Sequence, residues 1–285
     1  MFTVLDKNFS GSLTNNIDDY PEGIVIPIDK PYRWTSADVI RKLKFAACRH
    51  FGKKKLKVGH AGTLDPLATG VLLVCVGNAT KQAEELQRHD KEYIAGVTFG
   101  ATTPSYDLEK EIDRFFPYEH ITAEAVADAL KDFVGEQDQV APLFSAKSVE
   151  GIRAYELARK LLKDGALPEE ASELIRSSRI NISELELLHF QANSPSISNA
   201  QKKEDTVSRA SSRINVTDNS NLGLPRADIR LACSKGTYVR AFARDLGEAL
   251  GSGAHLDALQ RSRSGQFRVA DSLSVDEAMT LLGQS

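Results

Sequence analysis

The stretch Gly59–Gly77, "GHAGTLDPLATGVLLVCVG", places one acidic residue, Asp65, on a glycine-rich loop directly ahead of the most apolar part of the chain. The second half, "GVLLVCVG" (Gly70–Gly77), is a short apolar run rich in β-branched residues and bounded by glycines, which predicts a buried strand. Pro66 biases Asp65 toward an extended backbone, and the flanking glycines permit sharp turns. The pattern therefore predicts a carboxylate that projects from a stiff loop at the start of a core strand.

Strands and helices alternate irregularly around this segment. Alternating or continuous apolar runs predict strands, and apolar residues at helical spacing predict helices, the first of them capped by Ser36. The irregular order predicts an α+β fold with a curved mixed or antiparallel central sheet flanked by helices. The expected strands are Gly23–Lys30, Gly70–Gly77, Lys91–Gly100 and Ala227–Ser234, and the expected helices begin at Ser36, Thr80, Thr122 and Thr237.

Composition leaves both enzymes and binding modules open. The chain has 285 residues, 41% of them hydrophobic, and a formal net charge of −3, which by itself does not predict a nucleic-acid partner. Three scattered cysteines are typical of reduced core residues, and no segment has the apolar length of a membrane span or signal peptide, so we expect a cytoplasmic protein. A basic segment without acidic residues comprises Arg41, Lys42, Lys44, Arg49, Lys53, Lys54, Lys55 and Lys57.

Several common chemistries have no motif in this sequence. The histidines and cysteines lack the spacing of zinc ligands, so no metal is expected, and the phosphate-loop, dinucleotide and GxSxG motifs are missing. Taken singly, Asp65 is most simply a turn former, His60 a structural histidine, Tyr93 a sheet aromatic and Arg240 a solvated helix residue. Their joint occurrence in particular sequence contexts changes this interpretation.

Five separated segments together resemble the TruB-type tRNA pseudouridine synthases. The first carries the pattern G-H-x-G-x-L-D-P-x-A-x-G, the second the tyrosine of K-x-Y, and the third S-K-G-T-Y-x-R. The resemblance covers roughly Gly23 to Phe267. Three of the segments occur in the order "GHAGTLDPLATGVLLVCVGNATK" (59–81), "DKEYIAGVTFGATT" (90–103) and "CSKGTYVRAFARDLGEALGSGAHLDALQRSRSG" (233–265). The two others are "IDKPYRWTS" (28–36) near the N-terminus and "PLFSAKSVEGIRAYELAR" (142–159) in the middle.

The resemblance implies a fold, a reaction and a set of residues. It implies the pseudouridine synthase fold and an isomerase that converts uridine-55 in the T-loop of tRNA to pseudouridine without cofactor or metal. Asp65 matches the family nucleophile, for which attack on the ribose C1′ and attack on the uracil ring are both debated. Arg240 matches the arginine that keeps this carboxylate ionised and oriented, and Tyr93 matches the tyrosine that stacks on the extruded base.

Further residues are implied to bind the substrate. His60 matches a histidine that remodels the loop around the flipped nucleotide, and Leu259 matches a leucine that lines the pocket. The basic segment would hold RNA phosphates although the whole chain is acidic. The complete expected set of RNA- and substrate-binding residues is His60, Gly62, Thr63, Lys30, Lys235, Tyr238 and Leu259.

The expected domain organisation is a flexible leader (1–22), a catalytic domain (23–267) with a Ser- and Asn-rich insertion (193–226), and a short tail (268–285) without a full C-terminal RNA-binding domain. Arg33 stands where the family pattern has glycine, and Pro104 stands where it has aspartate. In "SAKS" (145–148), the usual lysine is displaced by one position.

We expect tRNA as the substrate, no membrane, no required protein partner and a monomer. Two alternatives stay open. One is an RNA-binding or RNA-folding protein whose isomerase activity is secondary or lost, and the other is an RNA-guided relative that modifies ribosomal RNA with partner proteins.

Overall fold

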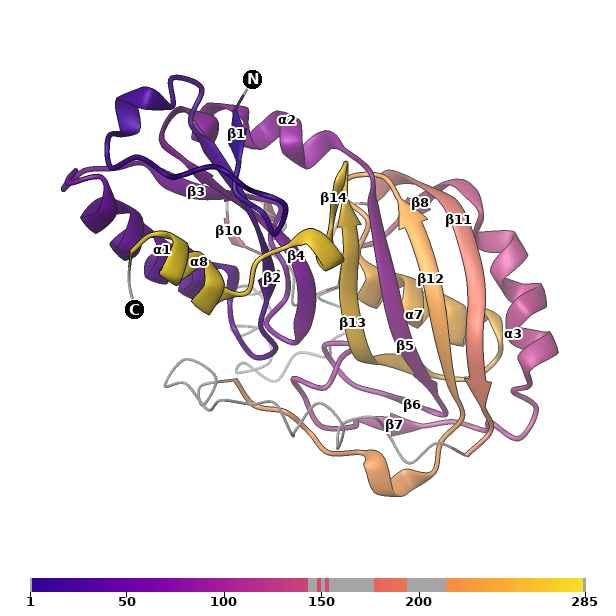
Figure 1. Cartoon of the computed structure of the whole chain (residues 1–285). Coiled ribbons are helices and arrows are strands. Elements are labelled where there is room, and N and C mark those ends of the chain that lie inside the picture. The colour runs from indigo at the N-terminus through magenta and orange to yellow at the C-terminus, as the bar shows by residue number, and fades with distance from the viewer. Residues whose placement is uncertain (1, 143–147, 150–151, 154–176, 194–213, 284–285) are drawn as a thin grey trace. The chain divides into compact units, whose positions relative to one another are not determined.

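The computed structural model describes residues 2–142, 148–149, 152–153, 177–193 and 214–283. The chain forms two compact units (Figure 1). Unit 1 comprises Met1–Tyr93, Asp205–Ile214 and Leu259–Ser285, and unit 2 comprises Ile94–Glu204 and Asn215–Ala258. Each unit combines sheet strands with packed helices, so the predicted α+β class is confirmed.

Unit 1 contains a mixed sheet with β4 in a central position. Its strand order is β1-β2-β4-β13, and two short strands extend it, with β3 paired to β4 and β14 paired to β13. β2 and β4 are antiparallel, whereas β4 and β13 are parallel, with Ala68 opposite Leu259. The bounds are β1 (Thr3–Val4), β2 (Ile24–Lys30), β3 (Val58–Ala61), β4 (Ala68–Val76), β13 (Ala254–Ser264, of which Ala254–Ala258 belong to unit 2) and β14 (Phe267–Arg268).

Both faces of β4 are covered, as its continuous apolar sequence predicts. Residues 70–76 are all buried, and alternate members of the strand, including Leu73, form a core cluster with Leu86 of α2. In the same unit α1 lies beside α8 (Figure 1). The helical segments of unit 1 are η1 (Ile17–Asp19), α1 (Ser36–His50), η2 (Gly77–Gln82), α2 (Ala83–Arg88), η6 (Val269–Asp271) and α8 (Val275–Leu281).

The N-terminal residues differ from the expectation of a flexible leader. Thr3 and Val4 pair in parallel with Ile24 and Val25 of β2, and the following Leu5 is fully buried. The physical reason is that β1 covers the edge of β2, which would otherwise expose its backbone hydrogen-bonding groups. Composition alone did not show this, because the apolar run is only a few residues long.

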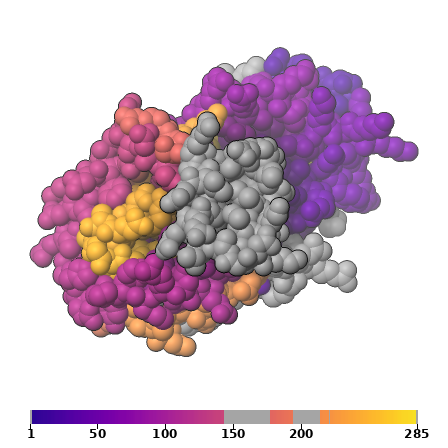
Figure 2. Space-filling view, turned by 180° about the vertical axis from the view of Figure 1, so that it is seen from behind, coloured from indigo at the N-terminus to yellow at the C-terminus, as the bar shows by residue number. Residues whose placement is uncertain are grey.

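Unit 2 contains the strand order β5-β12-β11-β8. β11 is antiparallel to both β12 and β8. Helix α7 packs against α3, and Figure 2 shows the two from behind, α7 in yellow-orange and α3 in magenta. The rings of Phe133 and Phe242 meet edge to face, with 5.6 Å between their centroids. The elements are β5 (Lys91–Phe99, of which Lys91–Tyr93 belong to unit 1), β6 (Ala101–Thr102), β7 (Arg114–Phe115), α3 (Ala123–Leu130), η3 (Lys131–Phe133), β8 (Gly135–Gln139), β9 (Ser148–Val149), β10 (Ile152–Arg153), β11 (Ser178–Gln191), η5 (Ser220–Leu222), β12 (Arg226–Cys233) and α7 (Val239–Ala249).

A buried ion pair lies in the core of unit 2. Arg226 Nε donates to Asp257 Oδ2 at 2.5 Å, and Thr98 Oγ1 donates to the same oxygen at 3.0 Å. A Cβ on Gly96 would lie 2.1 Å from the Arg226 guanidinium, so glycine makes room for this pair. The strand residue therefore serves close packing rather than a turn.

Two sequence predictions fall largely outside the described residues: the greater part (194–213) of the insertion predicted over 193–226, and most of the "PLFSAKSVEGIRAYELAR" segment. The described end of the insertion, residues 214–226, is ordered, with a helical turn at Ser220–Leu222 and a buried Leu224. In the part of the chain that is described, no helix is long and apolar enough to cross a membrane.

Candidate active site

Asp65 lies in the loop that joins two paired strands of unit 1. β3 and β4 are antiparallel neighbours, and residues 62–67, here called the Asp65 loop, connect them. Gly62 has a φ of 87°, in the left-handed region that favours glycine, so the chain turns sharply there. Asp65 is half-buried and Thr63 is exposed. The predicted loop ahead of the core strand is therefore confirmed.

Every backbone carbonyl from Gly62 to Pro66 accepts a hydrogen bond. Three of the donors are side chains, and they come from β13, α1 and the end of β2. Because separate elements hold one short loop, its backbone is fixed before any ligand arrives. The pairs are Gly62 O with Arg261 (2.9 Å), Thr63 O with Arg261 (3.5 Å), Leu64 O with Ser36 (3.2 Å), Asp65 O with the Ala68 N–H (3.1 Å) and Pro66 O with Lys30 (3.1 Å).

Ser36 binds the loop instead of capping its helix, so the predicted cap is wrong. The cap is Thr35, whose hydroxyl accepts from the Asp38 N–H, while the Asp38 carboxylate accepts from the Thr35 N–H. This arrangement leaves the Ser36 hydroxyl to bind both polar groups of Leu64. Ser36 Oγ accepts from the Leu64 N–H at 3.0 Å and donates to the Leu64 carbonyl at 3.2 Å.

Lys30, an expected substrate contact, is fully buried beneath the Asp65 loop. Its ammonium group donates to the carbonyls of Pro31 (2.9 Å), Trp34 (2.6 Å) and Pro66 (3.1 Å). Burial lowers the pKa of Lys30 to about 7, and the negative charge of Asp65 opposes that shift. In this conformation the side chain supports the loop and has no surface for RNA.

His60 and Leu259 flank the Asp65 loop. His60 is half-buried on β3, and burial together with the charge of Arg261 lowers its pKa, which favours the neutral ring. Leu259 on β13 pairs with Ala68, the residue that follows the loop. Tyr93, on β5, is the last residue of the first segment of unit 1 and is 8% exposed. Unit 1 thus contains most of the predicted site.

Arg240 lies at the start of α7 in unit 2 and is almost fully buried. Its guanidinium donates to the Ser105 carbonyl at 3.1 Å, and its Nε lies 3.7 Å from Asp107 Oδ2. Asp107 also accepts from the Ser105 hydroxyl at 2.6 Å. Sequence reasoning missed Asp107, because no motif that we read includes it. The predicted pairing of Arg240 with Asp65 links residues of different units, and it stays a prediction.

The two other predicted residues of unit 2 precede α7. Lys235 is exposed and Tyr238 is half-buried. The Tyr238 backbone is held by the Gln139 side chain, which accepts from its N–H at 2.8 Å and donates to its carbonyl at 3.2 Å. The turn that carries Lys235 and Tyr238 is therefore anchored to the end of β8.

Comparison with known proteins finds relatives over most of the chain. Residues 49–206 match the model of the TruB family of pseudouridylate synthases, N-terminal domain. The chain is 47% identical to the tRNA pseudouridine synthase B of Phocaeicola vulgatus, over 93% of this chain and 96% of that protein. The chain belongs to the TruB family. The protein of the same name from Parabacteroides distasonis is 45% identical, over 94% of this chain and 96% of that one.

Solved structures share the fold at lower identity. The archaeal box H/ACA sRNP Nop10-Cbf5 complex contains a chain with a TM-score of 0.53 and 21% identity, which covers 91% of this chain and 53% of its own length. A chain in the H/ACA RNP bound to a substrate RNA containing 2′-deoxyuridine has a TM-score of 0.55 and 20% identity, over 97% of this chain and 61% of its own length. This chain therefore spans little more than half of those proteins.

One departure from the TruB pattern, Arg33, has a backbone conformation that glycine favours. Arg33 replaces the pattern's glycine but has a φ of 61°, the left-handed conformation that glycine favours. For a residue with a Cβ this conformation costs about 1–2 kcal/mol. The Arg33 guanidinium donates to the Ile214 carbonyl at 2.8 Å, a hydrogen bond that glycine cannot make.

The basic segment is only partly neutralised by carboxylates. Arg41, Lys42 and Lys53 form ion pairs with acidic side chains of unit 1. The exposed members without an ion pair to any described residue are Lys44, Lys54, Lys55 and Lys57. This surface suits RNA phosphates.

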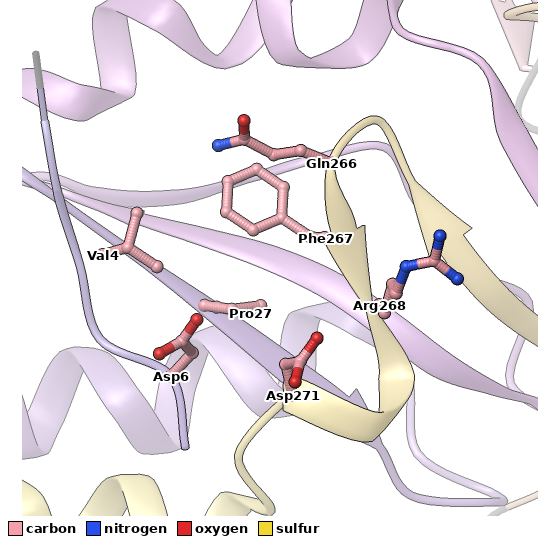
Figure 3. A pocket seen from close by; sticks show the side chains of 7 residues that line it. All are labelled: Val4, Asp6, Pro27, Gln266, Phe267, Arg268 and Asp271. Atoms are coloured by element: carbon pink, nitrogen blue, oxygen red, sulfur yellow. The ribbon is translucent and has the colours of Figure 1, made fainter. Parts of the chain in front are cut away.

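A pocket of about 340 Å³ in unit 1 is separate from the predicted residues. It is bordered by β1 and the β14 segment, with Phe267 at its wall and Arg268 directed away from it (Figure 3). Asp6 and Asp271 accept hydrogen bonds from Asn8, so both carboxylates already serve local structure. Within the described residues, no group of three or more His, Cys, Asp or Glu side chains is placed to hold a metal ion.

Proposed function

We propose that this chain is a tRNA pseudouridine synthase that isomerises uridine-55 of the T-loop, with Asp65 as the nucleophile. The observation that carries the proposal is the Asp65 loop itself. The family motif lies on a loop whose carbonyls from Gly62 to Pro66 all accept hydrogen bonds, so the carboxylate is held in place before the substrate binds. The printed names of the relatives support tRNA as the substrate.

The reaction is an isomerisation in which atoms and electrons balance. The N1–C1′ bond of uridine breaks, the uracil turns, and a C5–C1′ bond forms. The proton on C5 leaves and N1 gains a proton. A carboxylate nucleophile divides this substitution into two easier steps through a covalent adduct. Asp65 supplies that nucleophile, Arg240 orients it, and Tyr93 stacks on the flipped uracil.

Substrate binding is assigned to the surface around this loop. The unpaired lysines of the basic segment attract RNA phosphates, and His60 and Leu259 contact the flipped nucleotide. Lys235 and Tyr238 bind RNA from the turn before α7. The proposed enzyme acts on tRNA as a monomer in the cytoplasm, without a protein partner.

The test is release of tritium from a tRNA transcript that carries 5-³H-uridine. Wild type is expected to release tritium only when uridine occupies position 55. Asp65→Asn is expected to bind the transcript normally but to release none, whereas the control Asp90→Asn, at an exposed carboxylate in the same unit, keeps full activity. Turnover by Asp65→Asn at the wild-type rate would overturn the nucleophile assignment. Binding by wild type without release would favour an RNA-binding or RNA-folding protein.

A further inference from the structure

Arg261 is the least expected charged residue in unit 1. It lies on β13, and its side chain is only 2% exposed. The guanidinium donates to the Val71 carbonyl at 2.7 Å, to the Gly62 carbonyl at 2.9 Å and to the Thr63 carbonyl at 3.5 Å. One rigid fork of donors therefore joins Val71 of β4 to the Asp65 loop.

Stability does not explain this arginine. None of the described carboxylates forms an ion pair with it, so backbone carbonyls alone compensate its buried charge. A second buried cation, Lys30, lies close enough for the two charges to repel. Buried charges of this kind are costly, and apolar residues of similar volume are often as stable or more stable. Because Arg261 does not increase the stability of the fold, we expect it to contribute to the function of the site.

The surrounding backbone is shaped around Arg261. Gly70 has a φ of 93°, and a Cβ there would lie 2.2 Å from the Arg261 carbonyl oxygen, so β4 and β13 meet without a side chain between them. The open side of Gly62 faces the guanidinium, 3.6 Å from the position of a Cβ. Both glycines belong to the family motif around Asp65. Gly70 lets the Arg261 backbone approach β4 closely, while a Cβ at Gly62 would be in ordinary van der Waals contact with the guanidinium.

We propose that Arg261 is a positioning residue for the nucleophile. By drawing the carbonyls of Gly62 and Thr63 inward, it fixes the backbone two residues before Asp65 and so sets the direction of the carboxylate. Reactions of this kind depend on the placement of the attacking atom, and a displacement of about 1 Å can lower the rate about 100-fold. This inference rests on the proposed function, because it assumes that Asp65 reacts.

The test replaces the guanidinium group of Arg261 while it keeps the positive charge. Arg261→Lys retains the positive charge and an aliphatic stem, but it replaces the planar fork of Nε, Nη1 and Nη2 donors by one nitrogen and so loses the fixed donor geometry on Val71, Gly62 and Thr63. Under single-turnover conditions we expect tritium release to slow roughly 10- to 100-fold, while the Kd for tRNA changes by less than about twofold. Arg261→Gln, which removes the buried charge, is measured in the same way so that the test does not depend on one variant folding.

A purely structural role predicts a different pattern. The matched control is Val74→Ala, a fully buried position of β4 that makes no hydrogen bond to the loop. It should lower the thermal midpoint without slowing single-turnover release at a temperature where the fold is intact. A folded Arg261→Lys or Arg261→Gln variant with the wild-type rate would overturn the positioning role.

Asp65→Asn in the same assay keeps the two proposals apart. If Asp65→Asn is inactive while the Arg261 variants react like wild type, only the positioning inference fails. If Asp65→Asn reacts like wild type, the proposed nucleophile fails first.

Discussion

Ser36→Ala should separate support of the Asp65 loop from general stability. The change removes one hydroxyl at a position that is 4% exposed, and it leaves the N–H and the carbonyl of Leu64 buried without partners. Each unsatisfied buried group costs about 1–3 kcal/mol, so the two together cost about 2–6 kcal/mol. The loop can move so that the Leu64 backbone groups regain hydrogen bonds, which lowers this cost, and the movement displaces Asp65. We therefore expect a loss of unfolding free energy and a slower chemical step.

The assay combines two measurements on each variant. Urea unfolding gives the change in free energy, and single-turnover tritium release from the tRNA transcript gives the rate of the chemical step. Because about 1.4 kcal/mol corresponds to a tenfold change in rate, we expect release to slow at least about tenfold. The matched control is Thr35→Ala, which removes the helix cap next to Ser36, costs about 1 kcal/mol and should leave the rate unchanged. Equal rates for wild type and Ser36→Ala would refute the reasoning.

Two further predictions concern the cations of unit 1. Replacing both Lys54 and Lys55 with alanine should weaken tRNA binding. The slope of log Kd against log salt should fall by about 1 for each phosphate that the variant no longer neutralises. The control Lys131→Ala, in unit 2, should leave this slope unchanged. For Lys30, the folded pKa of about 7 lies below the unfolded value of 10.5, so across this interval the unfolded chain binds a proton that the folded chain lacks. The free energy of unfolding should therefore rise with pH by up to about 1.4 kcal/mol per unit. Urea unfolding at several pH values checks this, and parallel curves for wild type and Lys30→Met would contradict it.

The fold could be predicted where a single element carries its own signal. The continuous apolar run of β4 predicted a strand covered on both faces. The spacing of Val39, Ile40, Leu43 and Ala47 predicted the inner face of α1, and all of these are buried except Ile40, which is half-buried. Register and capping were harder to predict. Thr35 and Ser36 are adjacent and chemically similar, so the sequence could not show which of them caps α1 and which binds Leu64.

The sequence by itself determined the family, the α+β class and Asp65 as the candidate nucleophile, because these depend on the order and spacing of motifs, which can be read from the sequence alone. Only the tertiary structure decided what holds Asp65 in place. Lys30, Ser36 and Arg261 lie on three different elements. Pairing of β2, β4 and β13, together with packing of α1 on β3 and β4, brings them to one loop. Their partners are backbone carbonyls, which every residue possesses and which therefore leave no trace in the sequence.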